Sequence, residues 1–252
     1  MKSAGLARVL AATNGSDTGR HAVKFARGLA HDVGARIRLL SVTTDDIPGY
    51  LTDGASQPAG LSTENAARVR GVPGIEIVRD AQQWDANLIV IGRQLRVHIG
   101  EPMGRTVEAV VRRSPGPCLL VPPHVDRIGR ILVALDGTSR GLGVLPFAEM
   151  FTRALGVPAG TVLATADETN VETVRSRILP SLLDHPVLGG PGQLDVRVGS
   201  PVEQIIDAVG SAKADLLVIG IRRGGQIGGA GSGHVGRDLL LKAPSAILTV
   251  PI

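Results

Sequence analysis

Short apolar runs alternate along this chain with longer stretches in which apolar residues recur every three or four positions. The short runs predict buried strands, and the periodic stretches predict helices with one apolar face. In the stretch after residue 16, apolar residues at 22, 25, 26, 29 and 33 define such a face before the chain reaches Gly34, a typical helix-ending residue. The pattern therefore predicts an α/β protein in which helices cover parallel sheets.

The predicted elements occur twice, in the same order. Three segments of the first half match three of the second: 8–16 with 130–138, 71–92 with 199–220 without a gap, and 112–122 with 241–251. Ordered matches of this kind indicate an internal duplication. We therefore expect two domains, 1–123 and 128–252, each a doubly wound parallel sheet, joined by the turn-forming stretch 123–129.

Local signals place further elements in the second half. Ser200, Pro201 and Glu203 form a capping-box pattern and predict the start of a helix. Another helical stretch is expected at 171–183, although it contains Pro180, a residue type that tends to end helices. The corresponding part of the first half, 44–61, is rich in Gly, Pro, Asp and Ser, which predicts a long loop.

Composition narrows the kind of core and excludes some sites. Hydrophobic residues make up 43% of the 252 residues and aromatic residues only 2%, so the cores must be aliphatic, as suits buried parallel sheets. The single cysteine, Cys118, excludes an internal disulfide and a multi-cysteine metal site, and its apolar run predicts a core thiol. The six histidines show no spacing typical of metal ligands.

Charge and hydropathy argue against nucleic-acid and membrane partners. Four of the 27 basic residues are lysine, and the arginines are scattered without the interleaved aromatic residues that a nucleic-acid groove uses. No apolar run approaches the roughly 20 residues needed to span a bilayer. The N-terminus leads into a strand-like run without a signal-peptide pattern, so we expect a soluble, cytoplasmic protein.

The strongest candidate for chemistry is the glycine-rich segment 220–233. It follows an apolar run, contains Arg222 and Arg223, and precedes a helix-like stretch. Glycines let backbone N–H groups turn toward an anion, and a helix N-terminus adds partial positive charge. Ligands of doubly wound sheets bind at the carboxyl ends of the strands. We therefore expect this segment and the turn at Asp136 to meet at one sheet edge, as a nucleotide or phosphate site.

These segments together resemble the universal stress protein family in its tandem form. The resemblance rests on the order, spacing and duplication of several pieces: 9–16, 86–92 and 104–121 in the first half, and 131–138, 198–201, 214–220 and 233–250 in the second. It implies an adenine nucleotide alpha-hydrolase-like fold with two domains packed as a pseudo-two-fold pair. Pairing is implied through the last strands, 118–121 and 247–250, in place of the homodimer of single-domain relatives, and a further homodimer of the tandem chain stays open.

Family members that bind ATP carry Asp-Gly-Ser/Thr at a strand end and later Gly-x2-Gly-x9-Gly-Ser/Thr. The resemblance implies that the aspartate lies by the nucleoside and that the glycine loop wraps the phosphates. In the second half the matching residues are Asp136, Gly137, Thr138, Gly220 and Gly233, with Arg223 in place of the middle glycine and His234 in place of the final Ser/Thr. Arg222 and Val235 complete the set that the resemblance implies.

The first half departs further from this pattern. Asn14 replaces the aspartate, Leu95 stands where the middle glycine belongs, and the remaining positions are Gly92, Gly104, Arg105 and Thr106. Asn14 can accept one hydrogen bond but lacks the charge for a strong one. Leu95 cannot bind phosphate. We therefore interpret the first-half set as the weaker site.

The resemblance implies a stress-response regulatory protein that binds ATP or another adenine nucleotide through its second domain, with Mg²⁺ as an accompanying ion. No general-base arrangement can be assembled from the sequence, so we do not expect an enzyme, although weak ATP hydrolysis stays open. The alternative is an interaction or dimerisation protein that binds no nucleotide. The substituted motif positions favour it, because they add side chains where a glycine gives room.

Overall fold

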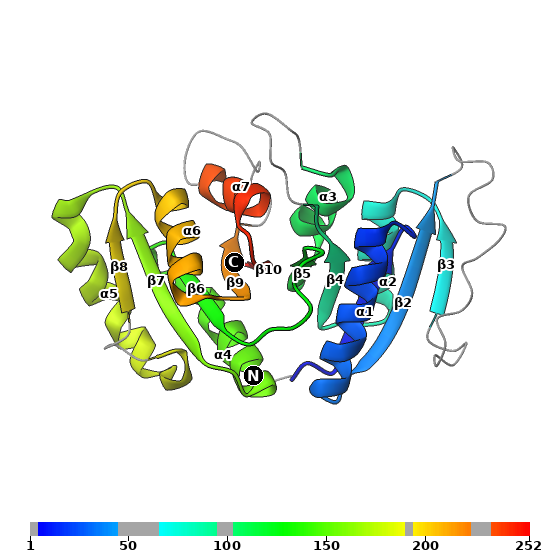
Figure 1. The fold of residues 1–252 in the computed structure, drawn as a ribbon, viewed down its shortest axis with the longest axis horizontal. Helices are drawn as coiled ribbons and strands as arrows, with labels where there is room; N and C mark the ends of the chain where they lie inside the picture. The colour runs from blue at the N-terminus through cyan, green and yellow to red at the C-terminus, as the bar shows by residue number, and fades with distance from the viewer. Residues whose placement is uncertain (1–4, 45–65, 95–102, 190–193, 223–232) are drawn as a thin grey trace.

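The fold is one continuous sheet covered by helices. The computed structural model describes residues 5–44, 66–94, 103–189, 194–222 and 233–252. Their strands form a ten-stranded sheet in the order β3-β2-β1-β4-β5-β10-β9-β6-β7-β8. Figure 1 shows the first half of the chain on one side of the molecule and the second half on the other, so that β5 and β10 lie at the centre.

Each half follows the expected alternation of strands and helices. The first half comprises β1 (Arg8–Thr13), α1 (Asp17–Asp32), β2 (Arg36–Thr43), β3 (Ala66–Arg70), α2 (Pro73–Gln83), β4 (Leu88–Gly92), α3 (Arg105–Arg113) and β5 (Cys118–Val121). The second comprises β6 (Ile131–Leu135), α4 (Leu145–Leu155), β7 (Ala159–Thr165), α5 (Val171–Leu183), β8 (Leu194–Val198), α6 (Pro201–Ala212), β9 (Leu216–Ile221), α7 (Gly233–Lys242) and β10 (Ala246–Pro251). Short 3-10 helices, including η2 (Gly141–Val144), join elements of the second half.

The two halves join through their last strands. Within each half the strands are parallel: β1 pairs with β2 and β4, and β6 pairs with β7 and β9. At the centre β5 and β10 run antiparallel, with Leu119 opposite Leu248 and Cys118 opposite Thr249. The halves therefore form the pseudo-two-fold pair that the resemblance implies. The expected boundary between 123 and 128 falls in the connection from β5 to β6.

Each face of the sheet has its own aliphatic core. One core joins α1, α4 and α5, and its largest fully buried side chain is that of Phe151. The other joins α2, α3, α6 and α7, with Ile77 among its buried residues. Neighbouring strand residues belong to opposite cores, as Leu119 and Leu120 do. Because both faces are covered, the central strands need apolar residues at every position, which explains the continuous apolar runs in the sequence.

Local details of the second half differ from the sequence-based expectations. Ser200 precedes α6 as expected, but its side chain makes no capping hydrogen bond, so the capping box is not formed. The helix start is instead set by Pro201, whose ring fixes the first helical φ. The helix α5 continues through Pro180 to Leu183. The loop expected at 44–61 lies outside the described residues except for residue 44, and no helix in the described ranges could cross a membrane.

Candidate functional site

The chain leaves β1 through a turn that Asn14 organises. The Oδ1 atom of Asn14 accepts hydrogen bonds from the backbone N–H of Ser16 (3.1 Å) and from the Ser16 hydroxyl (2.7 Å). The Ser16 oxygen accepts the Gly19 N–H at 3.2 Å and caps α1. Asparagine and serine bond nearby backbone in this way at turns and helix starts. The turn thus ends β1 and begins α1 at the carboxyl edge of the sheet.

Asp136 organises the equivalent turn after β6. Its Oδ1 accepts the Thr138 N–H at 2.9 Å and the Thr138 hydroxyl at 2.7 Å. The Thr138 oxygen accepts the Gly141 N–H at 3.0 Å. Asn14 and Asp136 therefore stand at the same point of the same hydrogen-bonded turn. The shared pattern of Asn/Asp, Gly and Ser/Thr is explained by the turn itself, before any ligand is considered.

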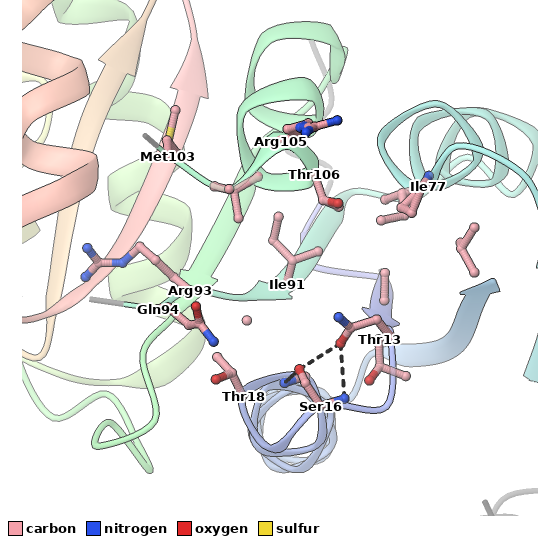
Figure 2. Close-up of a pocket in the computed structure, with 18 of the residues that line it drawn as sticks. Thr13, Ser16, Thr18, Ile77, Ile91, Arg93, Gln94, Met103, Arg105 and Thr106 are labelled. Carbon is pink, nitrogen blue, oxygen red and sulfur yellow. Dashed lines mark hydrogen bonds between the residues drawn. The ribbon is translucent and has the colours of Figure 1, made fainter. Parts of the chain in front are cut away.

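A cavity lies beside the first of these turns. Its volume of about 290 Å³ is near the lower end of the range for ligand sites. Figure 2 shows Thr13 and Ser16 on one side of it and Arg105 and Thr106, from α3, on the other. The described residues that line it are Ala12, Thr13, Asn14, Ser16, Thr18, Gly19, Val42, Pro73, Ile77, Ile91, Gly92, Arg93, Gln94, Met103, Gly104, Arg105, Thr106, Val107, Leu240 and Leu241.

The wall of this cavity has an apolar part and a polar part. The aliphatic surface comes from strand ends and from α2, through Ala12, Val42, Ile77 and Ile91. The polar part is formed by the hydroxyl-bearing residues Thr13, Thr18 and Thr106 and by the cationic residue Arg105. The helix α3 begins after Gly104, and no side chain of the described residues caps it. Its first N–H groups are therefore suited to bind an anion.

Arg93 lines the cavity and holds the two halves together. It follows β4 directly, and only 2% of its surface is exposed. Its guanidinium donates to the carbonyl oxygens of Leu240 (2.9 Å), Ala243 (2.7 Å) and Ser245 (2.6 Å), in the last turn of α7 and just beyond it. Burial lowers the Arg93 pKa to about 10, which still leaves the group charged at neutral pH. The cation therefore pairs carbonyls that the helix end leaves without partners.

The first-half residues of the sequence-predicted site meet around this one cavity. They come from the turn after β1, the end of β4 and the start of α3, and comprise Asn14, Gly92, Gly104, Arg105 and Thr106. Leu95 lies outside the described residues. The structure thus brings together the set that we interpreted from the sequence as the weaker one.

The second-half residues gather at the matching edge of the sheet. Those that lie at the ends of β6 and β9, two paired strands, are Asp136, Gly137, Thr138, Gly220 and Arg222. The helix α7 begins at Gly233 and carries Val235 in its first turn. Arg223 and the side chain of His234 are not among the parts that the structure describes. The second-half site therefore stays a prediction.

Helix α5 packs against the second turn. A Cβ atom on Gly137 would lie 2.5 Å from Val174 Cγ1, and the Arg177 guanidinium donates to the Gly137 carbonyl oxygen at 3.2 Å. Gly15 is the equivalent residue of the first half, and no described atom lies within 4 Å of a Cβ placed there. Among the described residues, the first turn is therefore open where the second is covered.

The strand-end glycines of the motif have a packing role in both halves. A Cβ atom on Gly92 would lie 2.6 Å from the Thr18 carbonyl oxygen of α1. On Gly220 it would lie 2.5 Å from Ile252 Cδ1 and 3.1 Å from Val144 Cγ1. Each glycine lets a neighbouring segment approach the strand end closely, so its presence in the sequence does not require a phosphate.

Sequence reasoning missed the contribution of the second half to the first-half cavity. Arg93 and Met103 lie beside the motif glycines, and Leu240 and Leu241 reach the cavity from α7. The available signal was an arginine directly after Gly92, where the repeat of the second half has an isoleucine. Among the described residues, no group of three His, Cys, Asp or Glu side chains could hold a metal ion.

Comparison with known proteins assigns the duplicated pattern to one family. The sequence model of the universal stress protein family matches residues 55–122 and 187–251, one match in each half and together more than half of the chain. Universal stress protein Slr1230 from Synechocystis sp. is 22% identical, over 96% of this chain and 98% of its own length.

Solved structures share the arrangement of the whole chain. A universal stress protein from Archaeoglobus fulgidus is 17% identical with a TM-score of 0.70, covering 97% of this chain and 98% of that one. A functionally unknown protein from Pseudomonas aeruginosa is 16% identical with a TM-score of 0.65, covering 99% and 93%. At these identities the structures establish the fold alone. The two family matches, one in each half of the duplicated fold, show that the chain belongs to the universal stress protein family.

Proposed function

We propose that this chain is a stress-response regulatory protein that binds a nucleotide, with the first-half cavity as the site that its geometry supports best. One observation carries the proposal: Asn14, Gly92, Gly104, Arg105 and Thr106 converge on one cavity beside a helix N-terminus. These are the positions that correspond to the ATP-binding pattern of the family. The role in a stress response follows from membership of the family.

The cavity offers separate surfaces for the base and the phosphate of a nucleotide. A flat base would lie on the aliphatic wall formed by Ala12, Val42 and Ile91, where it loses contact with water. A phosphate would lie at the start of α3, near the Arg105 guanidinium and the Thr106 hydroxyl. Backbone N–H groups at a helix start and a guanidinium both favour an anion.

The second half supplies a further candidate site, for ATP or another adenine nucleotide. Asp136 uses only Oδ1 in its turn, so Oδ2 is available to accept from a ribose hydroxyl or an adenine amine. Arg222 and Arg223 would pair with phosphate oxygens. Mg²⁺ that accompanies ATP would be coordinated mainly by phosphate oxygens and water.

The proposed activity is binding and not catalysis. The described wall of the first-half cavity carries hydroxyl, amide and guanidinium groups, and it includes no His, Cys, Asp or Glu that would act as a general base. Arg93 lines this cavity and bonds the end of α7, so one side chain contacts both the proposed site and the second half.

The substitution Gly104→Asp tests the first-half site with little risk to the fold. Gly104 is the residue that precedes α3, at φ −56°, and a Cβ there meets no described atom within 4 Å. Aspartate is a favoured residue at this position, so the helix should persist while the added charge repels phosphate. Gly104→Ser is the matched control, because serine caps the helix without a charge.

Calorimetric titration of the full chain with ATP and Mg²⁺ should show binding that Gly104→Asp weakens roughly ten-fold or more and that Gly104→Ser retains. Gly233→Asp makes the same test of the second half. Binding that neither aspartate variant changes would contradict both sites. No binding at millimolar ATP would favour the alternative, a protein that acts by interaction or dimerisation.

A further inference from the structure

The two strand-end turns present opposite hydrogen-bonding groups, and this difference narrows the class of nucleotide for the first half. The inference rests on the proposed function of the first-half cavity. In both turns the Oδ1 atom is occupied by the residue two positions on. The atom that remains is an amide nitrogen in Asn14 and a carboxylate oxygen in Asp136.

The orientation of the Asn14 amide is fixed by its own turn. The backbone N–H of Ser16 can only donate, so the atom that faces it at 3.1 Å is Oδ1 and not Nδ2. The Ser16 hydroxyl lies 2.7 Å from the same oxygen and fills its second acceptor position. Nδ2 has no hydrogen bond to any described residue, and Asn14 lines the cavity. The sequence predicts an acceptor at this position, whereas the structure presents a donor.

The aliphatic wall of the cavity adjoins this donor. Ala12 of β1 lies opposite Ile91 of β4, and Asn14 follows β1. A base that packs on this wall lies beside Asn14. Its phosphate then reaches the start of α3, where Figure 2 shows Arg105 and Thr106 across the cavity from Thr13 and Ser16.

Purine bases differ in the polarity of the group at position 6. Adenine carries an amine that only donates, and guanine and hypoxanthine carry a carbonyl oxygen that accepts. An amide N–H that faces a carbonyl oxygen makes a hydrogen bond. Facing an amine, it makes none, because both groups can only donate.

We propose that the first-half cavity selects purine nucleotides with a 6-oxo group over their 6-amino analogues. The Nδ2 atom of Asn14 donates to the 6-oxo oxygen, while the apolar wall holds the ring and the start of α3 holds the phosphate. A cavity of about 290 Å³ suits a mononucleotide better than a dinucleotide. The second-half turn, with a carboxylate oxygen of Asp136 at the equivalent point, has the opposite preference.

Inosine and adenosine 5′-monophosphates are matched probes, because their bases differ only at position 6 and in the proton on N1. Asn14 is exposed, so the preference corresponds to one hydrogen bond in contact with water. Such a bond changes affinity roughly 3- to 10-fold.

The experiment is a calorimetric titration of the full chain with each monophosphate, in the wild type and in Asn14→Asp. This variant keeps the Oδ1 atom that Ser16 bonds and replaces Nδ2 by an acceptor, so the turn should persist. Binding that Gly104→Asp removes is assigned to the first-half cavity. There we expect inosine monophosphate to bind roughly 3- to 10-fold more tightly in the wild type and the order to reverse in Asn14→Asp. Asp136→Asn is the control and should leave this ratio unchanged.

The outcomes separate this inference from the proposed function. Equal affinities at the first-half site, tighter binding of adenosine monophosphate, or a ratio that Asn14→Asp leaves unchanged would overturn the inference and leave nucleotide binding standing. No binding of either monophosphate at millimolar concentration would overturn both. Thermal unfolding checks that Asn14→Asp is folded, and the wild-type ratio decides the question if it is not.

Discussion

The turns after β1 and β6 make the same hydrogen bonds but have different surroundings. Asn14 and Ser16 bond each other as Asp136 and Thr138 do. The first turn borders a cavity that both halves of the chain line, whereas α5 packs against the second. The two halves thus share the hydrogen bonds that form a strand-to-helix turn, but they differ in the groups that would face a ligand.

This comparison separates two reasons why a motif residue is present: the packing of the fold and the binding of a ligand. Gly92 and Gly220 are required because neighbouring segments approach the strand ends, with or without a ligand. Asn14 and Asp136 are both suited to the turn, yet they leave a donor in one half and an acceptor in the other. A match to the motif therefore indicates first that the turn and the strand ends are formed. It indicates a ligand only through the side-chain atoms that make no hydrogen bond within the turn.

The largest expected effect comes from Arg93, which the second half replaces with Ile221. Arg93→Ala removes three hydrogen bonds to carbonyl oxygens of the buried residues Leu240, Ala243 and Ser245. We expect the free energy of unfolding to fall by about 3 kcal/mol or more. Urea unfolding followed by circular dichroism measures the change.

Arg105→Ala is the matched control for this prediction. Arg105 lines the same cavity but is exposed and makes no hydrogen bond to a carbonyl oxygen of the described residues, so its removal should change the free energy of unfolding by less than about 0.5 kcal/mol. Equal losses in the two variants would show that the contact between Arg93 and the end of α7 does not hold the halves together.

The fold could be predicted from the sequence because its signals are local and occur twice. The apolar runs, the helix faces and the order of matches define the strands, the helices and their duplication. The contact of Arg93 with α7 joins residues that are far apart in the sequence, and no periodicity indicates it. The cavity escaped prediction for the same reason, since Leu240 and Leu241 line it from the other half.

The group that Asn14 leaves available for a ligand differs from the one considered in the sequence analysis, for a local reason. An asparagine was expected to accept one hydrogen bond from a ligand. Its oxygen is instead taken by Ser16, two residues on, as is typical when Asn or Asp opens a turn. The sequence Asn14-Gly15-Ser16 is typical of a turn in which Ser16 bonds the Asn14 oxygen, but a comparison with a ligand motif does not predict this hydrogen bond.

A second prediction compares the strand-end glycines. A Cβ on Gly92 would meet the backbone carbonyl of Thr18, whereas on Gly220 it would first meet the terminal methyl of Ile252. The Ile252 side chain can adopt another rotamer, whereas the backbone of α1 cannot move aside in this way. We expect Gly92→Ala to cost about 2–3 kcal/mol and Gly220→Ala about 1 kcal/mol, measured by urea unfolding. The reverse order would mean that α1 can shift away from β4 more easily than its packing indicates.

A third prediction concerns the glycines inside the two turns. Gly15 has φ +80° and Gly137 has φ +74°, so alanine at either position is strained by about 1 kcal/mol. At Gly137 the new methyl group would also lie against Val174, so Gly137→Ala should cost about 2 kcal/mol in total. The control is to repeat both substitutions in a Val174→Ala background. There Gly137→Ala should cost only about as much as Gly15→Ala, and the cost of Gly15→Ala should not change. Additive losses in both backgrounds would show that α5 does not cover the second turn.

The smallest change in the free energy of unfolding is expected for Glu149 in α4. The residue at the equivalent position of α1 is Arg27. Desolvation raises the pKa of Glu149, but hydrogen bonds from His185 and Arg153 together lower it below the usual 4.5. A lowered carboxyl pKa contributes stability that is present above about pH 4.5 and is lost as the pH falls through the folded-state value. Glu149→Gln should therefore reduce the free energy of unfolding at pH 7 by about 1 kcal/mol or less and by a smaller amount at pH 3.

Urea unfolding at pH 7 and pH 3 measures this difference, with Arg27→Gln as the control. Arg27→Gln removes no carboxylate, so it should change the free energy of unfolding by the same amount at both pH values. If Glu149→Gln behaved in the same way, the carboxylate would not be stabilised by His185 and Arg153 in the folded state. The equivalent positions would then differ in sequence without differing in electrostatic role, unlike Asn14 and Asp136 in the turns that precede these two helices.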